Sequence, residues 1–199
     1  MSRHSDLYTE EYKGYTIRIL HDQDCSSPRE NDNLATIATW HKRYQLGDVQ
    51  PSEEPSEYIA GLPKGSIVLP VLMYEHSGIA LSTSAGSYPF TDPWDSGQVG
   101  YIHVSRDRVL KEWSAKRLTA KLRAKVLDVL KSEIKEYGAY VNGECYGYVI
   151  EDVDGDQIDS CWGFIGYEYV QQEARSQADW YAAERDKRNA EEREARDDS

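Results

Sequence analysis

The sequence predicts an α+β fold: a single domain with a mostly antiparallel sheet packed by one long helix, followed by a charged C-terminal helix. Three observations predict it. Strand-like and helix-like segments occur in mixed order, without the regular β-α alternation of a parallel sheet. Apolar runs flank short turn sequences, as they do in antiparallel hairpins. Residues 118–137 carry one apolar stripe at three- and four-residue steps, the pattern of a helix packed on a sheet.

Strands are predicted where apolar and polar residues alternate or where β-branched residues gather. These segments are residues 12–20, 34–44 and 98–104, a hairpin at 66–84 and a second hairpin at 145–170. Residues 34–44 also fit the helical period, so a helix there stays an alternative. Pro70 lies inside the first hairpin, which predicts an edge strand or a bulge because proline lacks the N–H that a sheet requires.

Helices are predicted from capping residues and apolar periodicity. Ser52 is placed to cap a short helix that runs through Ala60 and is closed by Gly61 and Pro63, and Ser105 is placed to cap another that runs to Trp113. The longest helix of the domain is expected from about Leu118 to Tyr137, and the glycine that follows is expected to end it.

The chain of 199 residues is long enough for one well-buried core. We expect a flexible N-terminus at residues 1–11, the α+β domain at 12–170, and a charged helix at 171–199 that frays into disorder. The last assignment depends on the density of Glu, Arg and Ala, and on an apolar stripe that fades after Tyr181.

The acidic stretch at residues 151–160 combines features of a calcium loop and of a hairpin turn. Counted from Asp152, acidic side chains occupy positions 1, 3 and 5 of a calcium loop, but positions 6 and 12 lack the required Gly and Glu. The pair Asp154-Gly155 supplies the positive φ angles of a tight turn. The stretch therefore predicts no metal site but a hairpin tip whose carboxylates form a binding surface. These carboxylates are Asp152, Asp154, Asp156 and Asp159.

Three cysteines, an odd number, do not suggest a disulfide framework. A turn centred on Asp154-Gly155 places Cys145 opposite Phe164 and Cys161 opposite Tyr148. The two thiols are therefore not expected to be cross-strand neighbours, which argues against a disulfide or a shared metal between them.

The chain carries 35 acidic and 23 basic residues, a net charge of −12 at pH 7. A negative surface repels nucleic-acid phosphates and attracts basic proteins, so we expect a protein partner with a basic surface and no direct contact with nucleic acid. Basic residues cluster on and before the long helix, but the acidic residues among them favour a solvated helix face. No apolar run is long enough for a membrane span or a signal peptide, so we expect no membrane partner and a cytoplasmic location.

Two functions fit these observations, and the binding protein is favoured over the enzyme. A binding protein needs only the acidic surface and the 15 tyrosines, a residue suited to recognition. A metal-assisted hydrolase, the alternative, needs carboxylates and histidines from the loops gathered in one cleft. No cofactor is expected for the first function, and a divalent metal is expected for the second. The candidate residues of such a cleft are Arg29, Glu30, Asp32, His41, His76, Asp92 and Asp95, with Asp22 and Asp24.

Four ungapped blocks resemble a family of phage- and plasmid-encoded accessory proteins of unknown function. The blocks are SPRENDNLATIATWHKRYQLGD (27–48), LPVLMYEHSGIALST (69–83), PFTDPWDSGQVGYIHVS (89–105) and GYVIEDVDGDQIDSCWGF (147–164). The corresponding motifs of the family are SPREWDNLG, DHSG, WDSGQVG and DSCWGF. This chain departs from them at Asn31, where the family has Trp, and at Ala35, where it has Gly.

The resemblance covers most of residues 12–166 and implies an accessory gene product of a phage or plasmid that acts inside a bacterial cell. Proteins of this kind often counter host defences or modulate host enzymes, and an acidic surface would suit a DNA mimic. The resemblance implies no catalytic residues.

Overall fold

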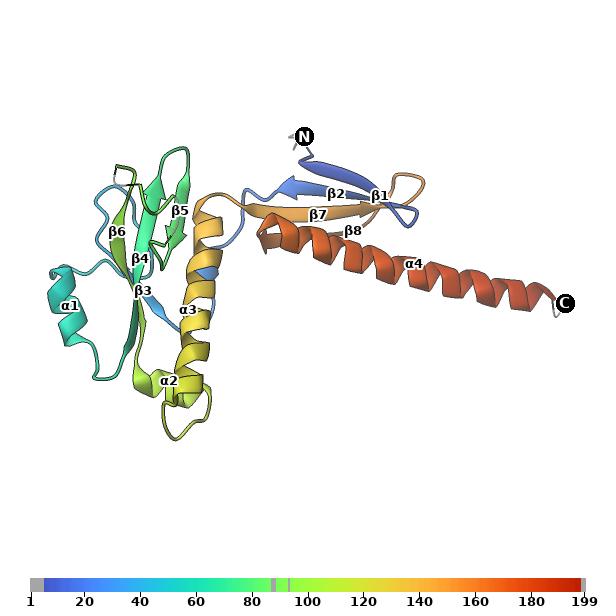
Figure 1. The fold of residues 1–199 in the computed structure, drawn as a ribbon. Coiled ribbons are helices and arrows are strands. Elements are labelled where there is room, and N and C mark those ends of the chain that lie inside the picture. Colours follow the sequence, from blue (N-terminus) through green and yellow to red (C-terminus); the bar gives the residue numbers. More distant parts are fainter. Residues whose placement is uncertain (1–5, 87–88, 93, 198–199) are drawn as a thin grey trace. The chain divides into compact units, whose positions relative to one another are not determined.

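The computed structural model describes residues 6–86, 89–92 and 94–197 and has an α+β fold with antiparallel strand pairing, as predicted (Figure 1). The strands form two sheets and not the one sheet that was predicted, because which distant strands pair is not decided by local pattern. In chain order the elements are β1 (Tyr8–Tyr12), β2 (Tyr15–His21), the 3-10 helix η1 (Pro28–Glu30), β3 (Thr36–Thr39), α1 (Pro55–Gly61), β4 (Ile67–Glu75), β5 (Ile79–Ser82), β6 (Ser96–Val104), α2 (Arg106–Glu112), α3 (Ala120–Val141), β7 (Cys145–Glu151), β8 (Gln157–Ile165) and α4 (Tyr167–Asp197). They form two compact units: unit 1 contains residues 1–26 and 144–199, and unit 2 contains residues 27–143.

Unit 1 is a four-stranded sheet of order β1-β2-β7-β8 with α4 along one face. The predicted alternation in β2 is confirmed, because Ile17 and Ile19 are fully buried in a core that α4 completes. The helix contributes small side chains at four-residue spacing, which lie on one helix face and let the backbone approach the aromatic residues of β7. The buried residues of α4 are Val170, Ala174, Ala178 and Ala182.

The C-terminal part of α4 continues past the sheet of unit 1 (Figure 1). Beyond Ala182 none of the described residues of α4 is buried, so its last turns depend on helix propensity and not on packing. The helix begins at Tyr167, a few residues before the predicted start. Within the described ranges, no helix combines the length and the apolar character that a membrane crossing requires.

Unit 2 is a second four-stranded sheet, of order β3-β6-β4-β5, and α3 packs against it. Strand residues such as Ile37, Ile67 and Ile102 form a buried core with the apolar stripe of α3, as predicted. The stripe residues are Val126, Leu130, Ile134 and Tyr137. Residues 34–44, for which strand and helix were both open, contain the strand β3.

The predicted end of the long helix at Gly138 is wrong, because α3 continues to Val141. Gly138 is buried against β5, and a Cβ atom there would lie 3.3 Å from the Cβ atom of Leu81. This glycine therefore allows close packing of helix and strand and does not terminate the helix.

The N-terminal segment also differs from the prediction. The single strand predicted at residues 12–20 is two strands, joined by a turn in which Lys13 and Gly14 both have positive φ angles of 53° and 82°. Residues 8–11 were expected to be flexible, but they pair with β2 in β1, and Glu10 binds Arg175 of α4 at 2.7 Å. Residues 1–5 lie outside the described residues.

Two further local predictions are corrected. The short helix begins at Pro55 with Glu54 as its N-cap, because proline is well suited to the first helical position, whereas Ser52 lies before the helix. Pro70 lies on the interior strand β4 and not at an edge. The alternative prediction of a bulge is confirmed, since the pairing of β4 with β6 shifts between Val71 and Leu72.

The second hairpin, β7–β8, is confirmed. Gly155 has a φ of 84° in the tip, but Asp154 is not among the described residues with a positive φ, so the predicted turn is correct only for its glycine. Cys161 pairs with Tyr148 as predicted. Cys145 pairs with Ile165 instead of Phe164, because the register shifts by one residue between Tyr146 and Tyr148. The thiols of Cys145 and Cys161 are not cross-strand neighbours, in agreement with the prediction.

Replacement of Gly100 by alanine tests the packing of β3 against β6. A Cβ atom at Gly100 would lie 2.2 Å from the carbonyl oxygen of Ala38, so the strands would have to separate. We expect Gly100→Ala to lower the free energy of unfolding by about 1–3 kcal/mol, measured by urea denaturation. Gly97→Ala is the matched control on the same strand, where no atom lies within 4 Å of the added Cβ, and a change within about 0.5 kcal/mol is expected. Equal stability of the two variants would contradict the close approach.

Candidate functional site

The candidate residues fall into separate groups. Asp22 belongs to unit 1, where its carboxylate accepts a hydrogen bond from the N–H of Gly163 at 2.9 Å. Within unit 2, Arg29 lies in a buried ion-pair network, whereas Asp32 is an exposed partner of Arg108 at 3.2 Å. Glu30 and Asp24 are exposed. The remaining candidates gather around a cavity of unit 2; these are His41, His76, Asp92 and Asp95.

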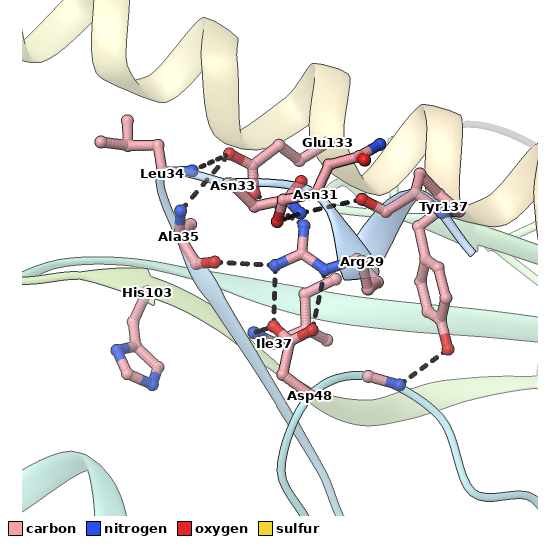
Figure 2. A network of polar contacts seen from close by, with 12 residues as sticks. Arg29, Asn31, Asn33, Leu34, Ala35, Ile37, Asp48, His103, Glu133 and Tyr137 are labelled. Carbon is pink, nitrogen blue, oxygen red and sulfur yellow. Dashed lines mark hydrogen bonds and ion pairs between the residues drawn. The ribbon is translucent and has the colours of Figure 1, made fainter. Parts of the chain in front are cut away.

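Arg29 is the centre of the buried network (Figure 2). Its side chain is only 8% exposed, and its guanidinium binds Asp48 through two hydrogen bonds, Nε to Oδ1 at 2.9 Å and Nη2 to Oδ2 at 2.7 Å. It also donates to Oε2 of Glu133 at 2.8 Å and to the carbonyl oxygen of Ala35 at 2.7 Å. Burial by itself lowers the pKa of Arg29, but the hydrogen bonds to the two carboxylates outweigh it and raise the pKa, so the group stays charged.

The two carboxylates of the network bind backbone as well. Oε1 of Glu133 accepts hydrogen bonds from the N–H groups of Leu34 and Ala35, at 2.9 and 3.3 Å, and Oδ2 of Asp48 accepts one from Ile37 at 2.7 Å. The network thus joins η1, the start of β3, the loop that follows β3, and α3. Because these contacts use the guanidinium to hold segments of unit 2 together, we assign Arg29 a structural role.

His76 and Asp95 form a close pair beside a cavity of about 320 Å³. Nδ1 of His76 lies 3.1 Å from Oδ2 of Asp95, and their side chains are 68% and 39% exposed. The cavity lies where β4 ends and β6 begins, next to the loop after β3. Its lining residues are His41, Met73, Glu75, Trp94, Asp95, Ser96, Gly97 and Val99.

Asp92 orders the loop that carries Asp95. Its Oδ1 accepts hydrogen bonds from the N–H groups of Trp94 and Asp95, at 2.8 and 3.2 Å, and its carbonyl oxygen accepts one from the Ser96 hydroxyl. The backbone of Asp95 is held in turn by the N–H of Glu75, at 2.9 Å. Asp92 is therefore used to form the turn, while the carboxylate of Asp95 is left facing His76.

A second polar group, built around His41 and Glu75, also lines the cavity. Nδ1 of His41 accepts a hydrogen bond from the N–H of Tyr44 at 3.1 Å, and the two rings stack with centroids 5.2 Å apart. The carboxylate of Glu75 accepts hydrogen bonds from the Tyr44 hydroxyl at 2.6 Å and from Arg43 at 2.7 Å. The hydrogen bond to Glu75 raises the pKa of Tyr44.

Sequence reasoning missed Glu75, Tyr44 and Trp94, the last of which is 92% exposed beside the cavity. The sequence could have indicated these three residues, because they lie in the same short segments as His76, His41 and Asp95. A histidine oriented by a carboxylate is the arrangement of a general base. In the described part of the chain, no three His, Cys, Asp or Glu side chains are grouped so that they could hold a metal ion.

The four aspartates of the β7–β8 tip have different roles. Asp152 turns its carboxylate into the loop, where Oδ1 accepts hydrogen bonds from the N–H groups of Asp154 and Asp156, both at 3.0 Å. Asp159 accepts one from the N–H of Ser160 at 2.7 Å. The side chains of Asp154 and Asp156 are exposed and form no hydrogen bond or ion pair with other described residues. These two carboxylates are therefore available to a partner.

The net charge is divided unequally between the units. Residues 1–26 and 144–199 contain 21 acidic and 9 basic residues, whereas residues 27–143 contain 14 of each. Unit 1 thus carries the whole net charge of −12, and unit 2 carries none. Sequence reasoning missed this division, because it depends on which segments share a unit.

The thiol of Cys145 is buried beside that of Cys25 in unit 1. Burial and then the hydrogen bond with Cys25 raise the pKa of Cys145 to about 12. Cys145 is therefore protonated at neutral pH and is not an activated nucleophile.

Replacement of Arg29 tests its structural role. Arg29→Ala leaves the carboxylates of Asp48 and Glu133 without their cation, and we expect a loss of about 3–5 kcal/mol in the free energy of unfolding. Arg43→Ala is the control, since it removes an ion pair to Glu75 from a side chain that is 72% exposed, and a loss below about 1 kcal/mol is expected. Urea denaturation of both variants measures the difference. A loss for Arg29→Ala as small as that of the control would rule out the network as a determinant of stability.

Comparison of the chain with protein-family models, with curated proteins and with solved structures finds no match.

Proposed function

We propose that this chain is an accessory binding protein of a phage or plasmid, and that its acidic unit 1 binds a basic surface of a host or phage protein inside the bacterial cell. The observation that carries the proposal is the concentration of the whole net charge of −12 in unit 1. A concentrated negative field accelerates encounter with a basic partner and disfavours acidic ones.

Exposed apolar side chains in the same unit support a protein as the partner. Val153 is 83% exposed in the β7–β8 tip, between Asp152 and Asp154. Tyr169 and Trp180 of α4 are each 54% exposed, and their separation of eleven residues places them on the same side of the helix. Aromatic side chains are frequent anchors of protein interfaces, and carboxylates around them supply charge complementarity.

The narrower role that fits this surface is inhibition by mimicry of DNA. A host defence enzyme that binds DNA presents a basic groove, and an acidic unit with apolar anchors could occupy that groove. The resemblance to accessory proteins of phages and plasmids supports the same role.

Neutralisation of the tip carboxylates tests this proposal. The full chain is immobilised, exposed to bacterial lysate at 50 and 500 mM salt, and its bound proteins are identified by mass spectrometry. We expect a partner with a basic surface that is released at high salt and is recovered several-fold less by Asp154→Asn/Asp156→Asn. Glu57→Gln/Glu136→Gln removes the same charge from exposed positions of unit 2 and should not change recovery.

Recovery that is insensitive to salt, or that falls equally for both pairs of substitutions, would contradict binding through unit 1. The proposal also fails if no protein is retained by the unaltered chain at low salt.

A hydrolase is the second candidate function, and the pair of His76 and Asp95 beside the 320 Å³ cavity is the observation that favours it. If this site is catalytic, His76→Ala and Asp95→Asn should each abolish hydrolysis of chromogenic ester or phosphodiester substrates, assayed with and without Mg²⁺ or Mn²⁺. His21→Ala, in unit 1, is the control and should retain the activity. The binding function predicts the opposite pattern: no turnover by the unaltered chain, and partner recovery unchanged by His76→Ala and Asp95→Asn.

A further inference from the structure

Unit 2 has no net charge, but its charges are not evenly distributed. Residues 106–125 contain eight Lys and Arg residues and two acidic residues, a local charge of +6. All eight basic side chains belong to exposed residues. We call this surface the basic end of unit 2; its basic residues are Arg106, Arg108, Lys111, Lys116, Arg117, Lys121, Arg123 and Lys125.

The fold brings these residues together at one end of unit 2. Val109 of α2 is fully buried in the same core cluster as Val126 of α3, and Trp113, Leu118 and Leu122 pack against that cluster. The helix α2, the loop that follows it and the first turns of α3 are thus fixed side by side (Figure 1). The basic residues lie on all three segments.

The N-terminus of α3 adds to the positive potential of the basic end. Thr119 caps this 22-residue helix by accepting a hydrogen bond from the N–H of Leu122 at 3.2 Å. Backbone N–H groups in the first turn of a helix, together with the helix dipole, favour anions such as phosphate.

Almost none of this charge is neutralised within the protein. Arg108 pairs with Asp32 at 3.2 Å, and Lys125 lies over the ring of Trp113, 5.4 Å from its centroid. Among the described residues, the other basic side chains of this surface have no carboxylate within ion-pair distance. Counterions occupy such a surface in solution, and their release is the main source of affinity for a polyanion.

The surface lacks the apolar anchors of a protein interface. The large hydrophobic residues that are exposed in the described chain all lie outside residues 106–125. Trp113 is only partly exposed and is covered by Lys125, so no aromatic platform for unpaired bases is present in this segment. A phosphate backbone requires neither anchors nor a stacking platform.

We infer that the basic end of unit 2 binds the phosphate backbone of double-stranded nucleic acid without sequence specificity. The net charge led us to expect no contact with nucleic acid, and the inference differs because salt screens exposed charges. At physiological salt, exposed charges interact over only about 8 Å, so contact at this surface depends on its local charge of +6 more than on the total charge of the chain. The inference is independent of the proposed function, which concerns unit 1.

Fluorescence anisotropy with a labelled 24-base-pair DNA of arbitrary sequence tests the inference. The full chain is titrated at 50, 100 and 200 mM salt. We expect binding that weakens steeply with salt, and a weaker interaction with the corresponding single strand. Lys116→Gln/Arg117→Gln/Lys121→Gln/Arg123→Gln should reduce the affinity on the order of tenfold or more and flatten the salt dependence.

The matched control removes four positive charges from exposed positions of unit 2 outside the basic end: Lys42→Gln/Lys64→Gln/Lys131→Gln/Lys135→Gln. Its affinity should stay within about threefold of the unaltered chain. Thermal unfolding of both variants verifies that their folds are unchanged, and Lys111→Gln/Lys116→Gln serves as a milder second variant. Asp154→Asn/Asp156→Asn should leave DNA binding intact, which separates this test from that of the proposed function.

Three results would overturn the inference. The first is no binding of the duplex at 50 mM salt. The second is an equal loss of affinity in the control set. The third is displacement of the DNA by poly-glutamate at matched charge concentration as effective as displacement by unlabelled duplex, which would indicate an acidic protein as the partner.

Discussion

Removing a guanidinium from water costs several kcal/mol, and the largely buried Arg29 is stable in unit 2 only because the nearly buried Glu133 and the partly exposed Asp48 both pair with it. Asp48 binds it through two hydrogen bonds, and Glu133 binds it while also accepting from two backbone N–H groups. Because the partners come from positions 19 and 104 residues away in the chain, the network couples the irregular segment before β3 to α3. The segment before β3 and the end of the loop that follows β3 depend on this arrangement for their positions.

The cavity of unit 2 is built on the same framework. The loop that carries His41 and Tyr44 starts at the end of β3 and finishes at Asp48, so the network anchors it at its far end. Asp95 also lines the cavity, and Asp92 and the backbone of Glu75 hold it in place. Hydrogen bonds therefore hold Asp95 of the His76–Asp95 pair in place, as a site of recognition or catalysis requires.

Charge is distributed unequally between the two units, and the total charge does not show this. Unit 1 carries the whole of −12, and unit 2 combines a neutral total with a local +6 at residues 106–125. Since screening limits exposed charges to short range, each surface selects its own partner. A chain that offers an acidic surface with aromatic anchors on one unit and a basic surface without them on the other is suited to contact a protein and a nucleic acid together.

The sequence by itself determined the features that local periodicity and turn chemistry control: the α+β class, the β7–β8 hairpin with its Asp154-Gly155 tip, the Ser105 cap of α2, and the buried stripe of α3. Only the tertiary structure decided which distant segments meet. The pairing of β2 with β7, the partnership of Arg29 with Glu133, and that of His76 with Asp95 join residues that no short-range pattern relates. The same holds for Gly138, which would end an isolated helix but here allows α3 to pack closely on Leu81 of β5. Local preference is decided within a few residues, whereas burial and long-range pairing depend on the whole chain.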